Sequence, residues 1–306
     1  MNYKEMLLSK NGLATHYLSR EFLKFSLNQK IPTVTEFCDK LNLSRGTVQN
    51  SIKFLQDNKA IELVSKGHLG TFLEEKNTKI LLEFAGITSI VGVMPLPYSR
   101  KYEGFATGLI STMENRYNIP CSLAYMRGAR NRVSMLLANR YDFAVLSKYA
   151  ALQFIEQGLE LSIIKEFGVH SYLSEHIVVF NDPTIKEIKD GMKVGIDSDS
   201  LDQQFLTEKA CGNKKVELIP VDYSQILTHI QSGVIEAAIW NKDEITDKDL
   251  KINYSPLVVD ELRDTEAVIV CRKADQIIPL LDELIDIKIV LDTQKLVLEH
   301  KLTPSY

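Results

Sequence analysis

Five polar residues stand at the start of one short amphipathic segment, and their side chains are of the types that contact double-stranded DNA. They are Ser44, Arg45, Thr47, Gln49 and Asn50. Arginine can donate two hydrogen bonds to guanine, glutamine or asparagine can pair with adenine, and hydroxyls suit phosphate oxygens. Such residues at the beginning of a recognition helix face the major groove. The pattern therefore predicts a base-reading surface; the alternative is a set of solvated polar residues on an ordinary surface helix.

Two predicted helices would position these side chains. Apolar residues at helical spacing follow Ser44, a favourable N-cap, as far as Leu55. The preceding helix starts at Thr33, and Glu36 three residues later completes a capping-box pattern. Only residues 42–43 separate the two segments, which is typical of a helix-turn-helix.

A hairpin is predicted directly after the second helix. Residues 61–64 read as a strand, 65–70 as a turn with two glycines and 71–73 as the returning strand. Lys66 and His68 lie at its tip, where a basic side chain can reach a phosphate or the minor groove; His68 could equally be an ordinary turn residue.

A further helix over residues 13–28 is expected to pack beneath the pair, and residues 1–11 could form another that helps protomers associate. The run LNLSRGTVQNSIKFLQDNKAIELVSKGHLGTFL, residues 41–73, resembles the winged helix-turn-helix of GntR-type bacterial repressors. In that family a cap, a recognition helix and a wing follow one another in this order. Pattern and resemblance together give as predicted DNA contacts Thr33, Ser44, Arg45, Thr47, Gln49, Asn50, Lys53, Lys66 and His68.

Composition bounds the rest of the chain. The 306 residues are 45% hydrophobic and 25% charged, which suits two or three globular units. No apolar run approaches the ~18 residues of a membrane span, and the first ten residues lack a signal-peptide pattern. A cytoplasmic protein with no membrane partner is expected. The four scattered cysteines are predicted to be reduced, structural thiols.

The net charge of −4 argues by itself against a nucleic-acid binder, but the charge is unevenly distributed. Up to residue 75 there are roughly 10 basic against 8 acidic side chains, and beyond it roughly 26 against 32. So small a positive excess predicts modest non-specific DNA affinity. Specific contacts from a homodimer on an inverted repeat would have to supply the remainder.

From residue 88 onward strand and helix signals alternate, which predicts an α/β body with mainly parallel sheets. Expected strands are 89–94, 122–126, 143–146, 176–180, 193–196, 216–220 and 235–240; expected helices are 102–116, 130–139, 200–210 and 224–232. The predicted organisation is a winged helix-turn-helix domain (α+β) at 1–75, a connector at 76–87 and a two-lobed body at 88–306. Its first lobe would span about 88–178 and 268–306, and its second lobe about 179–267.

The second half of the body carries a resemblance. The run from Lys193 to Asn241, ending in SGVIEAAIWN, resembles the second lobe of type 2 periplasmic-binding-protein folds, and residues 139–147 look like the equivalent strand of the first lobe. The resemblance implies that paired crossover strands near 177–180 and 267–271 form a hinge, and that a helix at about 277–302 returns to the first lobe. A winged domain joined to such a body most resembles the YhfZ-like family of bacterial helix-turn-helix proteins.

If the body has this fold, ligand contacts should come from the carboxyl ends of its strands, at the mouth of the cleft. The predicted ligand-binding residues are Tyr98, Ser99, Arg127, Gly128, Ser147, Ser198, Asp199, Ser200, Asp222, Tyr223 and Asn241. Helix-start amides and Arg127 or Arg130 favour an anionic group, whereas Asp197, Asp199 and Asp202 oppose it. An amino acid, an amine and a neutral polar ligand all stay open, as does an ordinary cap or turn at each position.

Motifs of catalysis and metal binding are missing from the sequence. The six histidines have no HxxxH or HExxH spacing, and there is no GxGxxG after a strand, GxxxxGK[ST] or GxSxG. No cofactor, metal or enzymatic activity is therefore predicted.

The resulting hypothesis is a DNA-binding transcription regulator, a dimeric repressor whose operator affinity responds to a small polar metabolite between the lobes. The alternative keeps the winged domain for protein interaction and makes the body a dimerisation scaffold without a ligand.

Overall fold

The computed structural model describes residues 9–117, 119–247, 250–257, 263–275 and 277–306, with only the backbone of residues 115–117. The suggested helix at residues 1–11 therefore lies largely outside the described residues. Contacts divide the chain into two compact units. The first comprises the described residues within Met1–Ile90, Met113–Pro120 and Gln276–Leu284, and the second comprises those within Val91–Thr112, Cys121–Asp275 and Ile285–Tyr306. The predicted domain limits at residues 75 and 88 stay predictions.

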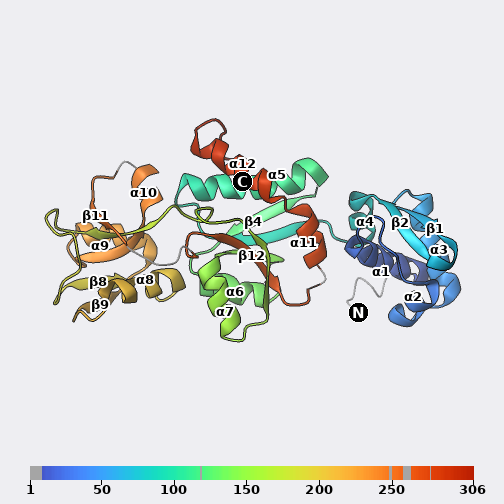
Figure 1. The fold of residues 1–306 in the computed structure, drawn as a ribbon, viewed down its shortest axis with the longest axis horizontal. Helices are drawn as coiled ribbons and strands as arrows, with labels where there is room; N and C mark the ends of the chain where they lie inside the picture. The colour runs from blue at the N-terminus through green and yellow to red at the C-terminus, as the bar shows by residue number, and fades with distance from the viewer. Residues whose placement is uncertain (1–8, 118, 248–249, 258–262, 276) are drawn as a thin grey trace. The chain divides into compact units, whose positions relative to one another are not determined.

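The first unit is built from helices and one hairpin (Figure 1). Its elements are α1 (Lys10–Lys24), α2 (Val34–Leu41), α3 (Arg45–Asp57), β1 (Ile61–Ser65), a 3-10 turn η2 (Gly67–Leu69), β2 (Thr71–Lys76), α4 (Thr78–Phe84) and α11 (Ile278–Leu284). Helix α1 packs against α3, α4 and α11. Fully buried apolar side chains, among them Leu18, Phe22, Phe37 and Leu55, form its core.

Local hydrogen bonds set the limits of the two central helices, as predicted. Thr33 and Glu36 form a reciprocal capping box at the start of α2. Asn42 ends α2 in the left-handed conformation, with φ 52° and ψ 47°, which asparagine tolerates well. Ser44 then caps α3 through the backbone N–H of Thr47. The predicted helix-turn-helix is confirmed.

The wing is longer than predicted. Strands β1 and β2 pair antiparallel from Ser65↔Thr71 out to Ile61↔Lys76, with a bulge between Glu62 and Leu63. The charged run after Leu73 therefore continues the strand, with Glu74 and Glu75 both exposed, and leads into α4. Helix α1 also differs from the expected residues 13–28. It starts earlier because Ser9 caps it, and it ends at Lys24 because Phe25 is extended.

The second unit contains two five-stranded mixed sheets, each the centre of one lobe. The first-lobe sheet has the order β4-β3-β5-β12-β6, with β3 (Ile90–Met94) parallel to β5 (Phe143–Ser147) and β12 (Ala267–Arg272) antiparallel to β5. The other strands are β4 (Cys121–Tyr125) and β6 (Leu161–Glu166). Its helices lie on the two faces, α6 (Ala129–Leu137) and α7 (Lys148–Glu156) on one, α5 (Arg100–Tyr117) and α12 (Ile287–Leu298) on the other (Figure 1).

The second-lobe sheet has the order β11-β7-β10-β8-β9. Strand β7 (His176–Phe180) is antiparallel to β10 (Ala237–Asn241), whereas β8 (Lys193–Ile196) is parallel to both β10 and β9 (Glu217–Pro220). The remaining elements are α8 (Leu201–Cys211), a 3-10 turn η3 (Tyr223–Gln225), α9 (Ile226–Gln231), α10 (Lys242–Asp247) and β11 (Asn253–Pro256). Trp240 and the apolar residues of α9 fill one side of this sheet.

The expected crossover strands near residues 177–180 and 267–271 lie in different sheets, β7 in the second-lobe sheet and β12 in the first, and their role as a hinge stays a prediction. Two other expectations for the body need correction. The expected single helix at 277–302 is two helices, since Asp286 caps a new helix through the N–H groups of Lys288 and Ile289. Strands β6 and β11 and helices α7 and α10 were not predicted, because weakly patterned segments take their structure from the sheet edge or face they join.

Helix α12 packs closely on α5. A Cβ atom on Gly108 would lie 2.8 Å from the Cα atom of Val290, so only glycine permits this approach. Among the described residues, no helix is both long and apolar enough to cross a membrane.

Candidate functional site

The recognition helix α3 presents a polar face to solvent. Arg45, Gln49, Asn50 and Lys53 are exposed, whereas the opposite face is buried through Val48, Ser51 and Leu55. The predicted apolar face is thus confirmed. The remaining predicted residues at the helix start, Ser44 and Thr47, are occupied with each other: their hydroxyl oxygens lie 2.8 Å apart while Ser44 caps the helix. Each hydroxyl can still meet a phosphate at the edge of this face.

Two other predicted DNA contacts have local structural roles. The Thr33 hydroxyl accepts a hydrogen bond from the backbone N–H of Glu36 at the exposed start of α2. At the wing, the ammonium group of Lys66 lies 4.6 Å from the ring centroid of Phe72, a cation–π contact that orients it. His68 stands exposed in η2.

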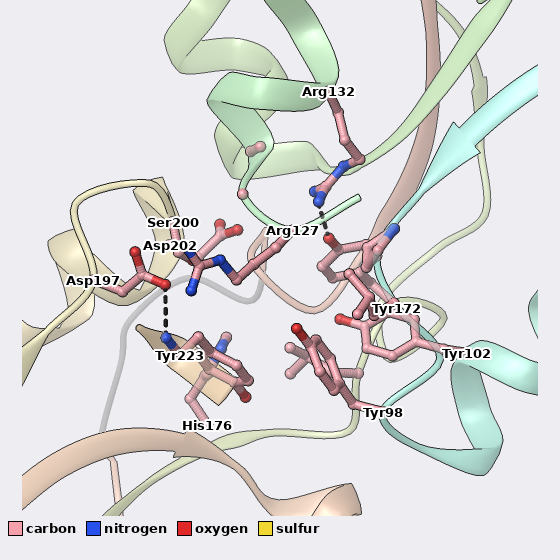
Figure 2. A pocket seen from close by; sticks show the side chains of 15 residues that line it. Tyr98, Tyr102, Arg127, Arg132, Tyr172, His176, Asp197, Ser200, Asp202 and Tyr223 are labelled. Atoms are coloured by element: carbon pink, nitrogen blue, oxygen red, sulfur yellow. Dashed lines mark hydrogen bonds between the residues drawn. The ribbon is translucent and has the colours of Figure 1, made fainter. Parts of the chain in front are cut away.

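The second candidate site is a pocket lined by both lobes of the second unit (Figure 2). Its empty space is about 580 Å³ when the open solvent at its mouth is included, and its cavity volume proper is about 60 Å³. Its walls combine four tyrosines, two arginines, two aspartates, a histidine and a few apolar or small residues. They are Pro95, Leu96, Tyr98, Tyr102, Arg127, Gly128, Ala129, Arg132, Tyr172, Leu173, His176, Asp197, Ser200, Asp202 and Tyr223.

Arg127 crosses from the first lobe to the second. Its guanidinium pairs with Asp222 at 2.6 Å and with Asp199 at 3.8 Å. The hydrogen bond to Asp222 raises the pKa of Arg127 and lowers the pKa of Asp222. Nearby, the Nε of Arg130 donates to the carbonyl of Ser198. The lobes therefore already make polar contacts across the pocket.

Arg132 enters the pocket from α6 and is only 4% exposed. Its Nε donates to the carbonyl of Val145 and its Nη1 to that of Met126. Its Nη2 donates to the hydroxyl of Tyr172 at 3.2 Å, and Figure 2 shows this contact at the pocket wall. The Tyr172 ring packs edge-on against Tyr102, and burial raises the pKa of both phenols, so both stay neutral at ordinary pH.

Two buried carboxylates line the opposite side, and their bonding differs. Asp197 accepts backbone hydrogen bonds on both oxygens, from Asp199 and Tyr223, each at 2.9 Å. Asp202 accepts one, at 2.6 Å, from the hydroxyl of Ser147 in the first lobe. Burial raises the pKa of Asp202 to about 6, against the lowering effect of the Ser147 hydrogen bond.

A histidine completes the polar wall. His176 contacts the carboxylate of Asp264 at 2.6 Å, and both side chains are 6% exposed. Within the described part of the chain, no three histidine, cysteine, aspartate or glutamate side chains gather as a metal site would require.

Five of the eleven predicted ligand-binding residues line the pocket: Tyr98, Arg127, Gly128, Ser200 and Tyr223. Four more do not line the pocket but contact charged residues in or beside it. Asp199 and Asp222 form ion pairs with Arg127. The Ser147 hydroxyl donates to Asp202, and the Ser198 carbonyl accepts from Arg130. The side-chain oxygen of Asn241 accepts a hydrogen bond from the backbone N–H of Asp243, and its own backbone N–H donates to the Tyr223 hydroxyl oxygen. Ser99 is 3% exposed and is not among the lining residues.

Sequence reasoning missed Tyr102, Arg132, Tyr172 and His176 as lining residues, and it treated Asp197 and Asp202 only as charges near the turn. Arg132 sits one turn inside α6 and Asp202 in the first turn of α8, where a polar residue looks like solvent-exposed surface. Burial of so many charged and phenolic groups around one pocket is the signal that marks them, and it exists only in the folded chain.

Comparisons with known proteins agree with this two-part architecture. Residues 28–73 match the family described as a helix-turn-helix domain, and residues 77–306 match the YhfZ C-terminal domain. The protein YhfZ of Escherichia coli (strain K12) is 34% identical over 310 residues, covering 99% of this chain and all of that protein, 100%.

Solved structures show the same relationship. The crystal structure of YhfZ from Shigella flexneri is similar with a TM-score of 0.61 and 36% identity, over 74% of this chain and 97% of that chain. An amino acid ABC transporter substrate-binding protein from Streptococcus pneumoniae, bound to L-arginine, has a TM-score of 0.52 and 10% identity, over 74% of this chain and 99% of that one. The second likeness concerns the fold alone: the second unit has a periplasmic-binding-protein-like α/β fold. With a family match over residues 77–306 and a relative matched along its full length, the chain belongs to the YhfZ family.

Proposed function

We propose that this protein is a DNA-binding transcription regulator whose operator affinity responds to a small polar metabolite in the inter-lobe pocket. The observation that carries the proposal is the joining, in one chain, of a helix-turn-helix with an exposed polar recognition face to a body with a polar pocket between two lobes. Neither feature would be needed by a purely structural protein.

In this proposal α3 enters the major groove. Arg45 and either Gln49 or Asn50 read base edges, while Ser44, Thr47 and Lys53 meet phosphates. Thr33 and the wing residues Lys66 and His68 contact the flanking backbone or minor groove. The protein acts in the cytoplasm as a homodimeric repressor on an inverted repeat, because the winged domain's small charge excess gives one copy little affinity.

The metabolite acts by population shift. It changes DNA affinity only if it binds one arrangement of the lobes better than another. Residues from both lobes line the pocket, so a bound molecule would favour the closed arrangement.

The DNA half is tested by binding to a labelled fragment from upstream of the protein's own gene, against an unrelated fragment, at two salt concentrations. The double variant Arg45→Ala with Lys53→Ala should lose at least about tenfold in affinity for the specific fragment. The matched control removes two exposed lysines of the second lobe, Lys186→Ala with Lys214→Ala, and should bind as the unaltered protein does. Equal, weak binding to both fragments by the unaltered protein would contradict the proposal.

The sensor half is tested by thermal unfolding. A pocket ligand present at 100 times its dissociation constant stabilises the protein by about 2.7 kcal/mol. A body that serves only as a dimerisation scaffold would show no such stabilisation with any small molecule.

A further inference from the structure

Two charged side chains of the pocket form no ion pair with any residue that the structure describes. Among the described residues, neither Arg132 nor Asp202 has an opposite charge within ion-pair distance, whereas Arg127 has two carboxylates. Both side chains are buried, at 4% and 7% exposure. A buried charge is unfavourable unless an opposite charge pairs with it. Two such unpaired charges in the wall of a pocket therefore indicate that the ligand carries the opposite charges.

Arg132 is arranged to receive an anion. Three of its five N–H groups are used by the carbonyls of Val145 and Met126 and by Tyr172, which leaves two donors and a whole positive charge. The first turn of α6 adds to this field: its N-cap, Gly128, makes no side-chain cap, and both Gly128 and Ala129 line the pocket. Free N–H groups at a helix start and a guanidinium in the same wall both favour a carboxylate.

Asp202 is arranged to receive a cation or a strong donor. One oxygen accepts from Ser147, and in the described part of the chain the second oxygen accepts no hydrogen bond. Asp197 is less available for this role, because each of its oxygens already accepts a backbone hydrogen bond. Burial raises the pKa of Asp202 most; the Ser147 hydrogen bond, the nearby His176 and, to a smaller extent, the charge of Arg132 lower it, so Arg132 acts on Asp202 without touching it.

The tyrosines supply a further donor and apolar area. The hydroxyl of Tyr98 is buried without a hydrogen-bond partner among the described residues, and Figure 2 shows it directed toward the middle of the pocket. The Tyr223 ring, stacked on Trp240 at a centroid distance of 4.3 Å, forms a rigid wall beside it.

We propose that the pocket ligand is a zwitterion of the α-amino-acid type, with its carboxylate on Arg132 and the start of α6, and its ammonium on Asp202. The ligand's own side chain packs among the tyrosines. Because Arg132 belongs to the first lobe and Asp202 to the second, such a ligand joins the lobes through its two charges. This inference rests on the proposed function, since it names the class of the metabolite.

The test uses the full-length protein and the twenty L-amino acids as separate probes, followed by thermal unfolding and titration calorimetry. At least one should bind. Its N-acetyl derivative, which lacks the ammonium, and its carboxamide, which lacks the carboxylate, should each bind at least about tenfold more weakly. An N-acetyl derivative that binds as tightly as the free amino acid would overturn the proposal.

Substitutions assign each charge. Asp202→Asn keeps an acceptor for Ser147 and should weaken the amino acid at least about tenfold while leaving the N-acetyl derivative unchanged. Arg132→Gln tests the carboxylate in the same way: it should weaken binding of the amino acid and leave binding of the carboxamide unchanged. Tyr98→Phe removes a hydroxyl that bonds to nothing described, so the protein should fold normally and bind the amino acid several-fold more weakly. Equal weakening of amino acid and derivatives by these variants would overturn the assignment.

A second probe set separates this inference from the proposed function. If none of the twenty amino acids binds but succinate, putrescine or glucose does, the zwitterion proposal fails and ligand sensing stands. If no probe of either set raises the melting temperature, the zwitterion proposal fails, and the DNA-binding half is judged by the operator experiment alone.

Discussion

The recognition helix and the pocket differ in where their specifying interactions lie along the sequence. Thr33 with Glu36, and Ser44 with Thr47, are three residues apart and fix the helix-turn-helix through local hydrogen bonds. In the pocket, Ser147 and Asp202 are 55 residues apart, and Arg132 and Tyr172 are 40 apart. Local rules therefore describe the first site, whereas the second exists only after long-range packing.

The two sites also differ in how they affect stability. Caps in the winged domain stabilise the fold, while burial of the Asp202 charge opposes it. Three sets of substitutions sharpen this contrast, and they follow in decreasing order of expected effect.

Asp202→Asn should stabilise the ligand-free protein at pH 7 by up to about 3 kcal/mol, because a shift of one pKa unit is worth about 1.4 kcal/mol. The folded pKa is about 6 against an ordinary value of 3.8, so the native state prefers the protonated group. The destabilising effect of the charge is therefore full above pH 6 and disappears as the pH falls toward 4. Urea unfolding of both proteins at pH 4 and pH 7 measures the difference.

Asp190→Asn is the matched control for that substitution. Asp190 is exposed, and its carboxylate also accepts a hydrogen bond, from the backbone N–H of Lys215. It should leave stability nearly unchanged at both pH values. A pH-independent gain from Asp202→Asn would show that the buried charge is not its cause.

The same change at two helical glycines should have opposite signs in the two regions. Gly108→Ala places a methyl group 2.8 Å from the backbone of Val290 and should destabilise the second unit by about 2 kcal/mol. Gly46→Ala in α3 meets nothing within 4 Å and should be neutral or stabilise by up to about 1 kcal/mol. Thermal unfolding of the two variants side by side checks both signs; a loss at Gly46 as large as that at Gly108 would break the contrast.

Thr33→Ala should remove one half of the capping box and destabilise the winged domain by about 1 kcal/mol. Thr35→Ala, at an exposed position within the same helix, is the control and should be neutral. Hydrogen exchange of the α2 amides reports on the helix directly. Equal protection in both variants would mean that packing of Phe37, and not the cap, holds the helix.

Sequence patterns predicted most elements to within a few residues where the hydrophobic periodicity and the capping residues indicate the same limits. Strands β7 and β8 match the predicted ranges. Strand β7 is a short, largely apolar run between Glu175 and Asn181, and β8 ends at the polar turn that begins with Asp197. Predictions failed at segments whose structure depends on neighbours. The expected C-terminal helix breaks at Asp286, whose backbone N–H donates to Thr112 on α5, a contact invisible in the local pattern.

The sequence by itself determined the helix-turn-helix, its wing and the α/β alternation of the body, because caps, turns and periodicity act within a few residues. It also placed Tyr98, Arg127, Gly128, Ser200 and Tyr223 at strand ends that meet at the pocket. Only the tertiary structure decided that Arg132 and Asp202 face that pocket without an ion partner in the described part of the chain, and that Arg127 is already paired. The reason is physical: burial and charge pairing are properties of side chains brought together from distant segments, and no local spacing encodes them.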